Sequence, residues 1–183
     1  LERDEICSGC SYGNAGWVVP SHSVPLAGPG VIRKALRWML DPESPFYIKP
    51  RFDLDLFRWL WRFRAAANER TMRENVSFLS DLTRASLALY DGLVAEEGLE
   101  CSYDRNGLLV LFKTAQGYRE GLEEAQLVEQ HGVHMRELTP EGVLDMEPNV
   151  RPDISGGIFY RDEAHLNPWE FVTGLAERFQ QKG

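Results

Sequence analysis

The chain has 183 residues, of which 43% are hydrophobic and 26% charged, and its formal net charge is −8. This balance is that of an ordinary globular protein, and it excludes a disordered chain, a collagen and a disulfide scaffold. The acidic total argues against a nucleic-acid-binding protein. Charges or glycines interrupt every apolar run before the roughly 20 residues that a bilayer requires, so no membrane span is expected.

Both ends of the sequence resemble cuts through a longer chain. The sequence opens on Leu1-Glu2-Arg3, without a methionine or a polar leader, and closes on an amphipathic segment that reaches Gly183. A strand usually follows such a helix in α/β proteins. We therefore expect an interior fragment of a longer protein.

The first half of the chain predicts one long loop and three helices. Residues 7–30 are rich in Gly, Ser, Pro and Asn without a helical period, which indicates a connecting loop of the kind that often carries function. A helix is expected over 31–40, because prolines follow it. Asp53 is a candidate N-cap for a second helix, and apolar spacings of three and four predict a third over about 71–98.

The second half predicts alternating strands and helices. The expected strands are 108–112, a short one around 133–135, and 156–160; the expected helices are 115–130, one between Thr139 and Glu147, and one that begins at Asn167. Thr139 and Asn167 are each followed by proline, as is typical of an N-cap before a first helical position. The fold class expected is α/β, in the mixed α+β sense.

Charge is unevenly distributed along the sequence. Residues 31–64 carry a net charge of +4 and include three of the five tryptophans. This composition is typical of a segment that touches a lipid surface. A pair of helices with aromatic residues in the core and arginines on a solvated face has the same composition.

Neither the cysteines nor the paired histidines predict a metal site. Cys7 and Cys10 form a C-x-x-C pair, but tetrahedral zinc needs four ligands and Cys101 stands alone in another segment. A redox dithiol is disfavoured because no helix follows the pair. His131 and His134 are expected to diverge, because a helix end and a glycine separate them.

Two titratable residues, His165 and Glu2, lie at positions where α/β proteins often have functional-site residues. His165 lies between a predicted strand and a helix N-terminus, although a solvent-exposed loop histidine is the plainer alternative. Glu2 ends a strand-like segment and precedes a loop of small residues. At that position a dinucleotide-binding unit has an acidic residue on the adenosine ribose, and small residues let backbone N–H groups reach phosphate. The chain has no complete G-x-G-x-x-G, P-loop or G-x-S-x-G motif.

Several segments together resemble bacterial FAD-dependent D-amino acid dehydrogenases of the D-amino acid oxidase and glycine oxidase superfamily. They are L-E-R at 1–3, S-Y-G-N-A-G-W-V-V-P at 11–20, P-L-A-G-P-G-V at 25–31, W-M-L at 38–40, G-G-I at 156–158 and A-H-L-N-P at 164–168. The resemblance implies a fragment of a two-domain FAD-dependent oxidoreductase. Residues 1–30 would end the Rossmann-like FAD domain, 31–162 would belong to a helix-rich substrate domain with a mixed sheet, and 163–183 would return to the FAD domain.

The resemblance also implies a set of site residues. The expected FAD contacts are Glu2 on the adenosine ribose with Arg3 beside it, and Ser11, Asn14, Ala15, Gly16 and Trp17 along the pyrophosphate and flavin ring, largely through backbone. His165 is the candidate on the substrate side. The family's G-x-G-x-x-G motif and its carboxylate-binding arginine and tyrosine do not occur in this chain, so the chain alone is not expected to be active.

The chemistry implied by the resemblance is the oxidation of a small amino acid. A hydride passes from the Cα of a D-amino acid to the flavin, and the imino acid is hydrolysed to a 2-oxo acid and ammonia. Glycine, sarcosine or hydroxyproline are alternative substrates that these residues do not separate. Three cysteines without a secretion signal suit the cytoplasm.

A membrane contact is expected if the reduced flavin passes its electrons to a quinone. If the electrons pass to a membrane quinone, the basic residues 31–64 are the expected peripheral contact with the inner face of the plasma membrane. An alternative of another class is a non-catalytic helical module that docks to a membrane or a partner through the same residues and never holds flavin.

Overall fold

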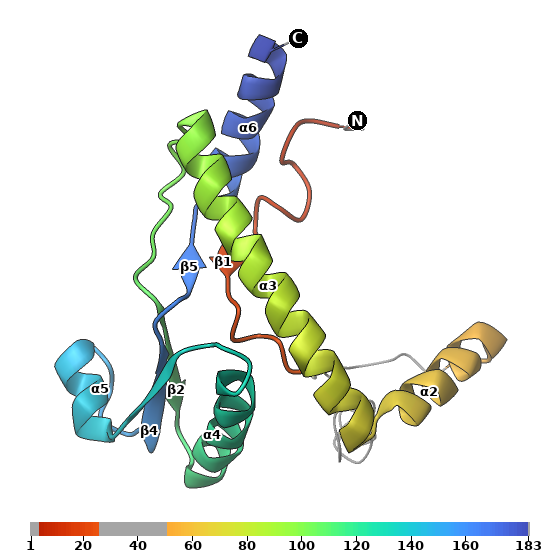
Figure 1. Cartoon of the computed structure of the whole chain (residues 1–183), viewed down its shortest axis with the longest axis vertical. Helices are drawn as coiled ribbons and strands as arrows, with labels where there is room; N and C mark the ends of the chain where they lie inside the picture. The colour runs from red at the N-terminus through yellow and green to blue at the C-terminus, as the bar shows by residue number, and fades with distance from the viewer. Residues whose placement is uncertain (1–3, 26–50, 183) are drawn as a thin grey trace. The chain divides into compact units, whose positions relative to one another are not determined.

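The computed structural model describes residues 4–25 and 51–182, which divide into two compact units (Figure 1). The first unit comprises residues 4–22 and 80–182, and the second comprises 23–25 and 51–79. The helix predicted over 31–40 and the predicted cofactor contacts Glu2 and Arg3 lie outside the described residues.

A three-stranded antiparallel sheet forms the centre of one part of the first unit. Its strands are β2 (Leu108–Phe112), β4 (Gly156–Tyr160) and β3 (Met135–Leu138), in the order β2-β4-β3. Ile158 of β4 faces Val110 on one side and Glu137 on the other, and its side chain is fully buried. The strands predicted over 108–112 and 156–160 are confirmed, and the short third strand begins at Met135, two residues later than predicted.

Two helices pack on this sheet. They are α4 (Ala115–Glu129), which contacts all three strands, and α5 (Pro140–Met146), which contacts β3 and β4. Each begins at a threonine N-cap: Thr114 accepts a hydrogen bond from the N–H of Gly117, and Thr139 accepts one from Gly142. These bonds satisfy backbone donors that the first helical turn leaves free. The two predicted helices and the Thr139 cap are confirmed.

One helical glycine lets α4 approach the sheet closely. A Cβ at Gly121 would lie 2.3 Å from the ring of Phe112. We expect Gly121→Ala to lower the free energy of unfolding by about 1–3 kcal/mol, because the added methyl overpacks this contact. Urea denaturation measures the change.

The matched control is Gly92→Ala in α3 (Glu69–Glu97), where the nearest atom to an added Cβ is a flexible carboxylate oxygen at 3.9 Å. This substitution should raise the free energy of unfolding by about 0.5–1 kcal/mol, because alanine is the better helix former. Equal effects of the two substitutions would contradict the role assigned to Gly121.

The first unit has a second, smaller sheet, formed by two short strands that lie side by side in Figure 1. They are β1 (Trp17–Val18) and β5 (Ala164–His165), with Trp17 opposite His165 and Val18 opposite Ala164. The prediction of an uninterrupted loop over 7–30 was wrong at β1. Two residues show no period in the sequence, and the strand forms only because a partner from the other end of the chain adds its hydrogen bonds.

A hydrophobic cluster joins the end of α3 to α6 (Pro168–Lys182). Its buried members are Leu99, Cys101 and Leu166, and the half-buried side chains packed on them are Val18, Tyr90, Val94, Tyr103, Phe171 and Leu175. The predicted N-cap of α6 is confirmed, because Asn167 accepts hydrogen bonds from the N–H groups of Trp169 (3.1 Å) and Glu170 (3.3 Å). The cluster fixes the start of α6 beside the small sheet.

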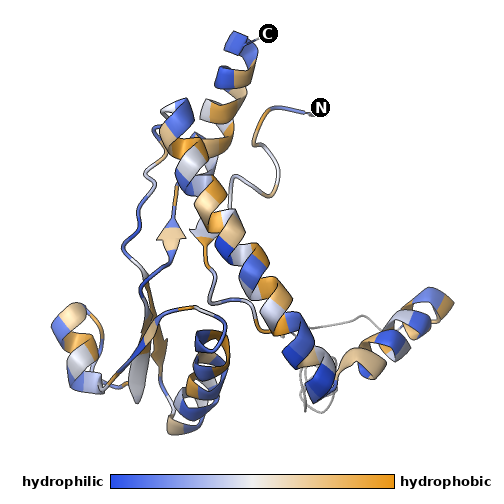
Figure 2. Ribbon diagram, viewed as in Figure 1, coloured by the Kyte–Doolittle hydropathy of each residue, from blue (hydrophilic) through white to orange (hydrophobic). Residues whose placement is uncertain are grey.

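The second unit contains α2 (Leu54–Ala66), a helix with apolar and polar residues interleaved (Figure 2). The predicted N-cap is confirmed, since Asp53 accepts hydrogen bonds from the N–H groups of Leu56 and Asp55, and these bonds lower the pKa of Asp53. No residue of α2 is buried. Among the described residues, no helix combines the length and the apolar character needed to cross a bilayer.

Candidate functional site

The predicted flavin loop is closed by its own asparagine. The side chain of Asn14 accepts a hydrogen bond from the N–H of Gly16 at 2.7 Å and donates one to the carbonyl of Ser11 at 3.2 Å. These two bonds join the ends of residues 11–16 across a short turn. The loop is therefore shaped by local bonds, while residues 12–15 remain exposed.

Gly16 fixes this loop against the connection between β5 and α6. Its φ is +67°, and a Cβ at this position would lie 1.9 Å from the carbonyl oxygen of Leu166. The N–H of Leu166 in turn donates to the carbonyl of Gly16 at 3.0 Å. Only glycine fits this conformation and this approach. The two sequence segments that carried the resemblance thus meet here.

The middle of the loop presents backbone donors that have no acceptor among the described residues. Within the described part of the chain, no residue accepts from the N–H groups of Gly13, Asn14 or Ala15. An added Cβ at Gly13 would meet nothing within 4 Å. Consecutive N–H groups in an exposed loop segment suit a close approach by an anionic group.

The structure places Trp17 and His165 directly opposite each other in the β1–β5 pair. Trp17 is 54% exposed and makes an edge contact with the ring of His22, with 6.0 Å between centroids. His165 is exposed, and its backbone exchanges hydrogen bonds of 2.9 and 3.0 Å with Asp104. The predicted substrate-side histidine therefore lies beside the predicted cofactor loop.

A buried glutamate next to this ribbon escaped the sequence analysis. The side chain of Glu163 is only 1% exposed, and its Oε1 accepts a hydrogen bond from the N–H of Ser21 at 2.9 Å. Burial raises the pKa of Glu163 to about 7. The sequence carried no signal for this residue, because it follows Asp162 in a polar turn and glutamates are rarely buried.

The cysteine pair takes no part in a disulfide. Cys7 is buried, with its Sγ 3.9 Å from the carbonyl oxygen of Pro168, while Cys10 is exposed, and both are free thiols. No group of three His, Cys, Asp or Glu side chains suited to a metal ion occurs within residues 4–25 and 51–182.

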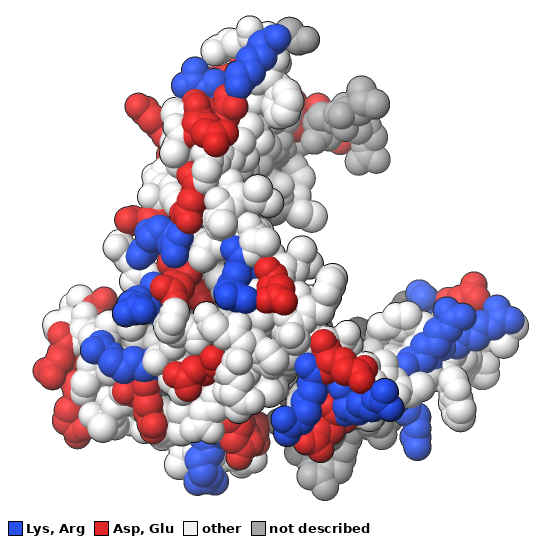
Figure 3. Space-filling view, viewed as in Figure 1, with Lys and Arg blue, Asp and Glu red and all other residues white. Residues whose placement is uncertain are grey.

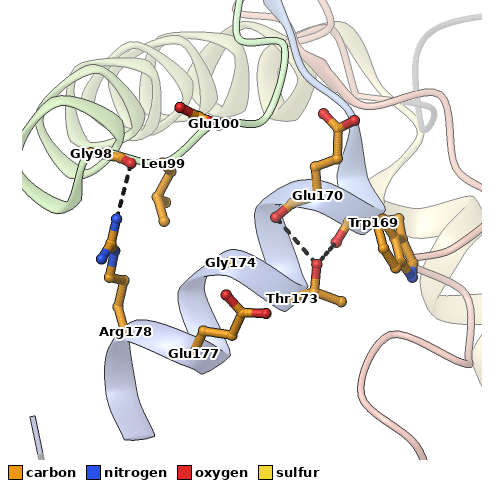
Figure 4. Close-up of a pocket in the computed structure, with 9 residues that line it drawn as sticks. All are labelled: Gly98, Leu99, Glu100, Trp169, Glu170, Thr173, Gly174, Glu177 and Arg178. Atoms are coloured by element: carbon orange, nitrogen blue, oxygen red, sulfur yellow. Dashed lines mark hydrogen bonds between the residues drawn. The ribbon is translucent and has the colours of Figure 1, made fainter. Parts of the chain in front are cut away.

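Two of the cavities lined by described residues of the first unit lie apart from the exposed loop. One of about 470 Å³ lies between the end of α3 and α6, where Arg178 donates to the carbonyl of Gly98 at 3.3 Å (Figure 4). The other, of about 250 Å³, is lined by Pro20, Arg105, Asp162 and residues of α3. None of the predicted site residues lines either cavity.

Comparison with known protein families identifies the family of this chain. The model of the DAO family, described as FAD dependent oxidoreductase, matches residues 1–183. The chain belongs to this family. The expected cofactor class and the mixed α/β fold of a DAO-family flavoenzyme are confirmed.

Curated relatives of this DAO-family chain are named D-amino acid dehydrogenase. The protein from Xanthobacter autotrophicus is 32% identical over 176 residues, which cover 94% of this chain and 42% of the relative. The protein from Helicobacter pylori (strain ATCC 700392 / 26695) is 24% identical over 183 residues, which cover 100% of this chain and 43% of the relative. The chain thus spans less than half the length of these relatives.

Solved structures of the same fold include two glycine oxidases. The enzyme from Bacillus cereus ATCC 14579 superposes with a TM-score of 0.55 at 22% identity, over 57% of this chain and 30% of its own. The enzyme from Geobacillus kaustophilus gives a TM-score of 0.52 at 21% identity, over 55% and 28%. These likenesses concern the fold of the DAO family.

The loop of this DAO-family chain fits the cofactor that the family uses. FAD carries two phosphates and a flat ring, and the loop offers N–H groups at Gly13, Asn14 and Ala15 that no described residue accepts, with open space around the Cβ position of Gly13. The anchored glycine at position 16 holds that backbone in place. The residues present therefore suit a backbone contact with FAD.

Proposed function

We propose that this chain is part of an FAD-dependent dehydrogenase that oxidises D-amino acids to 2-oxo acids and ammonia. Support comes from the DAO family match and from relatives named D-amino acid dehydrogenase. The observation that carries the proposal is the loop of residues 11–16, which is exposed at residues 12–15, held against Leu166 by Gly16 and beside His165. When bound, FAD supplies the acceptor for the hydride of the amino acid Cα.

The residues of this chain would bind FAD and orient the substrate. Backbone N–H groups of residues 13–15, together with Trp17, would hold the phosphate and ring edges of FAD, and His165 would lie on the substrate side. Glu2 and Arg3 would bind the adenosine ribose. The division into residues 1–30 and 163–183 of the FAD domain and 31–162 of the substrate domain is part of this proposal.

A visible spectrum of the full-length protein that contains this chain tests the proposal. We expect a flavin spectrum that bleaches when D-amino acids are added without oxygen. A protein that takes up no FAD would overturn the proposal as a whole. Bleaching by glycine, sarcosine or hydroxyproline, but by no D-amino acid, would leave the flavin chemistry and overturn the substrate.

We also propose that α2 lies on a membrane surface, at the inner face of the plasma membrane, where a quinone would accept the electrons. Within the described part of the chain, three of the aromatic side chains of α2 are exposed, Trp61 at 74%, Phe57 at 55% and Trp59 at 48%, while Phe63 is half-buried and stacks on Trp59 with 5.3 Å between ring centroids. The helix carries Arg58, Arg62 and Arg64, of which Arg58 pairs with Asp55 at 3.2 Å. Figure 3 shows blue basic side chains along this helix, with red acidic atoms beside them. Aromatic and basic residues in one helix suit the interface of an anionic bilayer.

Liposome sedimentation of the full-length protein measures this contact. We expect binding to vesicles with anionic lipid and weaker binding to neutral ones, and Trp61→Ser should reduce the bound fraction by about threefold or more, because a buried aromatic ring contributes over 1 kcal/mol. Phe179→Ser, which changes an exposed aromatic residue of α6, is the control. Equal binding to both kinds of vesicle would contradict the proposal.

A further inference from the structure

Glu163 ties the segment after the flavin loop to the turn between β4 and β5. Its Oε1 accepts the N–H of Ser21 at 2.9 Å, and its carbonyl accepts the N–H of Gly107, before β2, at 3.2 Å. Ser21 lies four residues after Trp17 and is also buried. The glutamate thus joins β1, β2 and β5 at one point.

The same two residues carry unpartnered polar atoms. The Oε2 of Glu163 and the Oγ of Ser21 are buried, and no described residue makes a hydrogen bond to either. An ionised carboxylate with one buried, unpaired oxygen is costly. A neutral acid keeps the acceptor for the Ser21 N–H and carries a proton on the other oxygen, for which a hydroxyl is a suitable acceptor.

The surroundings favour the neutral acid up to about pH 7. Burial raises the pKa of Glu163 to about 7, and the charge of Asp162 acts in the same direction. The N–H and the hydroxyl of Ser21, together with the charge of Arg105, oppose this shift. Arg105 is itself paired with Asp91 at 2.6 Å.

The remaining groups around the glutamate are already engaged or neutral. Asp162 contacts the ring of His134. Tyr160 of β4 is held neutral, since burial and the charges of Glu124 and Glu163 raise its pKa to about 12. None of these groups supplies a full counter-charge to Glu163.

We propose that Glu163 is a positioning residue of the FAD site: in its protonated form it holds residues 18–21, and through them the loop of residues 11–17, in the conformation that binds FAD. The inference rests on the proposed function, because it assigns that loop to FAD. Loss of the proton leaves a buried charge, and the segment opens to hydrate it.

The experiment compares FAD binding by the full-length protein at pH 6 and pH 8.5, using the quenching of flavin fluorescence. We expect the dissociation constant of the unmodified protein to rise about tenfold between these pH values, within the usual range of coupling between two sites. In Glu163→Gln a neutral amide replaces the acid and mimics its protonated form at every pH. This variant should bind FAD tightly at both pH values. Glu129→Gln, the same change at an exposed position of α4, should keep the pH dependence.

A second readout does not depend on FAD. Hydrogen exchange of a peptide covering residues 18–23 in the FAD-free protein, corrected for intrinsic rates, should show protection that falls above pH 7, and Glu163→Gln should abolish that fall. FAD binding that is the same at both pH values, or a pH dependence that survives in Glu163→Gln, would overturn the inference. A protein that binds no FAD at any pH, yet shows the exchange change, would overturn the proposed function.

Discussion

Replacing Gly16 with alanine is expected to destabilise the protein by about 3 kcal/mol or more. The added methyl would lie 1.9 Å from the carbonyl oxygen of Leu166, and both sides of this contact are backbone. A backbone oxygen cannot rotate away as a flexible side chain can, so the β1–β5 pair has to separate. The φ of +67° adds a further cost of about 1 kcal/mol for any residue with a Cβ.

Gly9→Ala is the matched control for this substitution. It lies in the same loop-rich segment, and its Cβ would meet nothing within 4 Å. Its free energy of unfolding should be unchanged or slightly raised, because alanine restricts the unfolded chain. Urea denaturation of the two variants measures the difference, and FAD titration should show weaker binding for Gly16→Ala alone. Similar stabilities of the two variants would refute the close approach at Gly16.

Local chemistry was sufficient to predict most of the helices and strands. Asp53, Thr139 and Asn167 each carry a side-chain oxygen that bonds the first N–H groups of a helix, and this capping depends only on neighbours in the sequence. The β1–β5 pair was not predictable in this way. Its strands have two residues each, and they exist because distant segments meet.

The same distinction between local contacts and contacts between distant segments applies to the candidate site. The resemblance singled out Gly16 as a flavin contact, whereas the structure shows that its first requirement is the approach to Leu166. Asp162 and Glu163 are neighbours of the same charge in one turn, yet one contacts His134 and the other is buried against Ser21. Which of two adjacent acids faces inward depends on strand pairing, and composition does not encode it.

The buried acid should make the stability of the protein depend on pH. The pKa of Glu163 is about 7 in the folded state, above the 4.5 of an ordinary glutamate, so between these values the folded protein binds more protons than the unfolded chain. The free energy of unfolding therefore falls as the pH rises from about 4.5 to about 7 and is level for this group above that. At 1.36 kcal/mol per pKa unit the loss is about 3 kcal/mol.

Glu163→Gln removes this titration while keeping the acceptor for the Ser21 N–H. We expect the variant to match the unmodified protein near pH 4.5 and to exceed its free energy of unfolding by about 3 kcal/mol at pH 8, because only the unmodified protein then carries a charge at this site, which costs free energy whether it stays buried or is hydrated by opening of the segment. Urea denaturation at the two pH values measures this, with Glu129→Gln as the exposed control. A variant less stable than the unmodified protein at pH 8 would mean that the fold stabilises the ionised carboxylate, and the proton assigned to Glu163 would then be wrong.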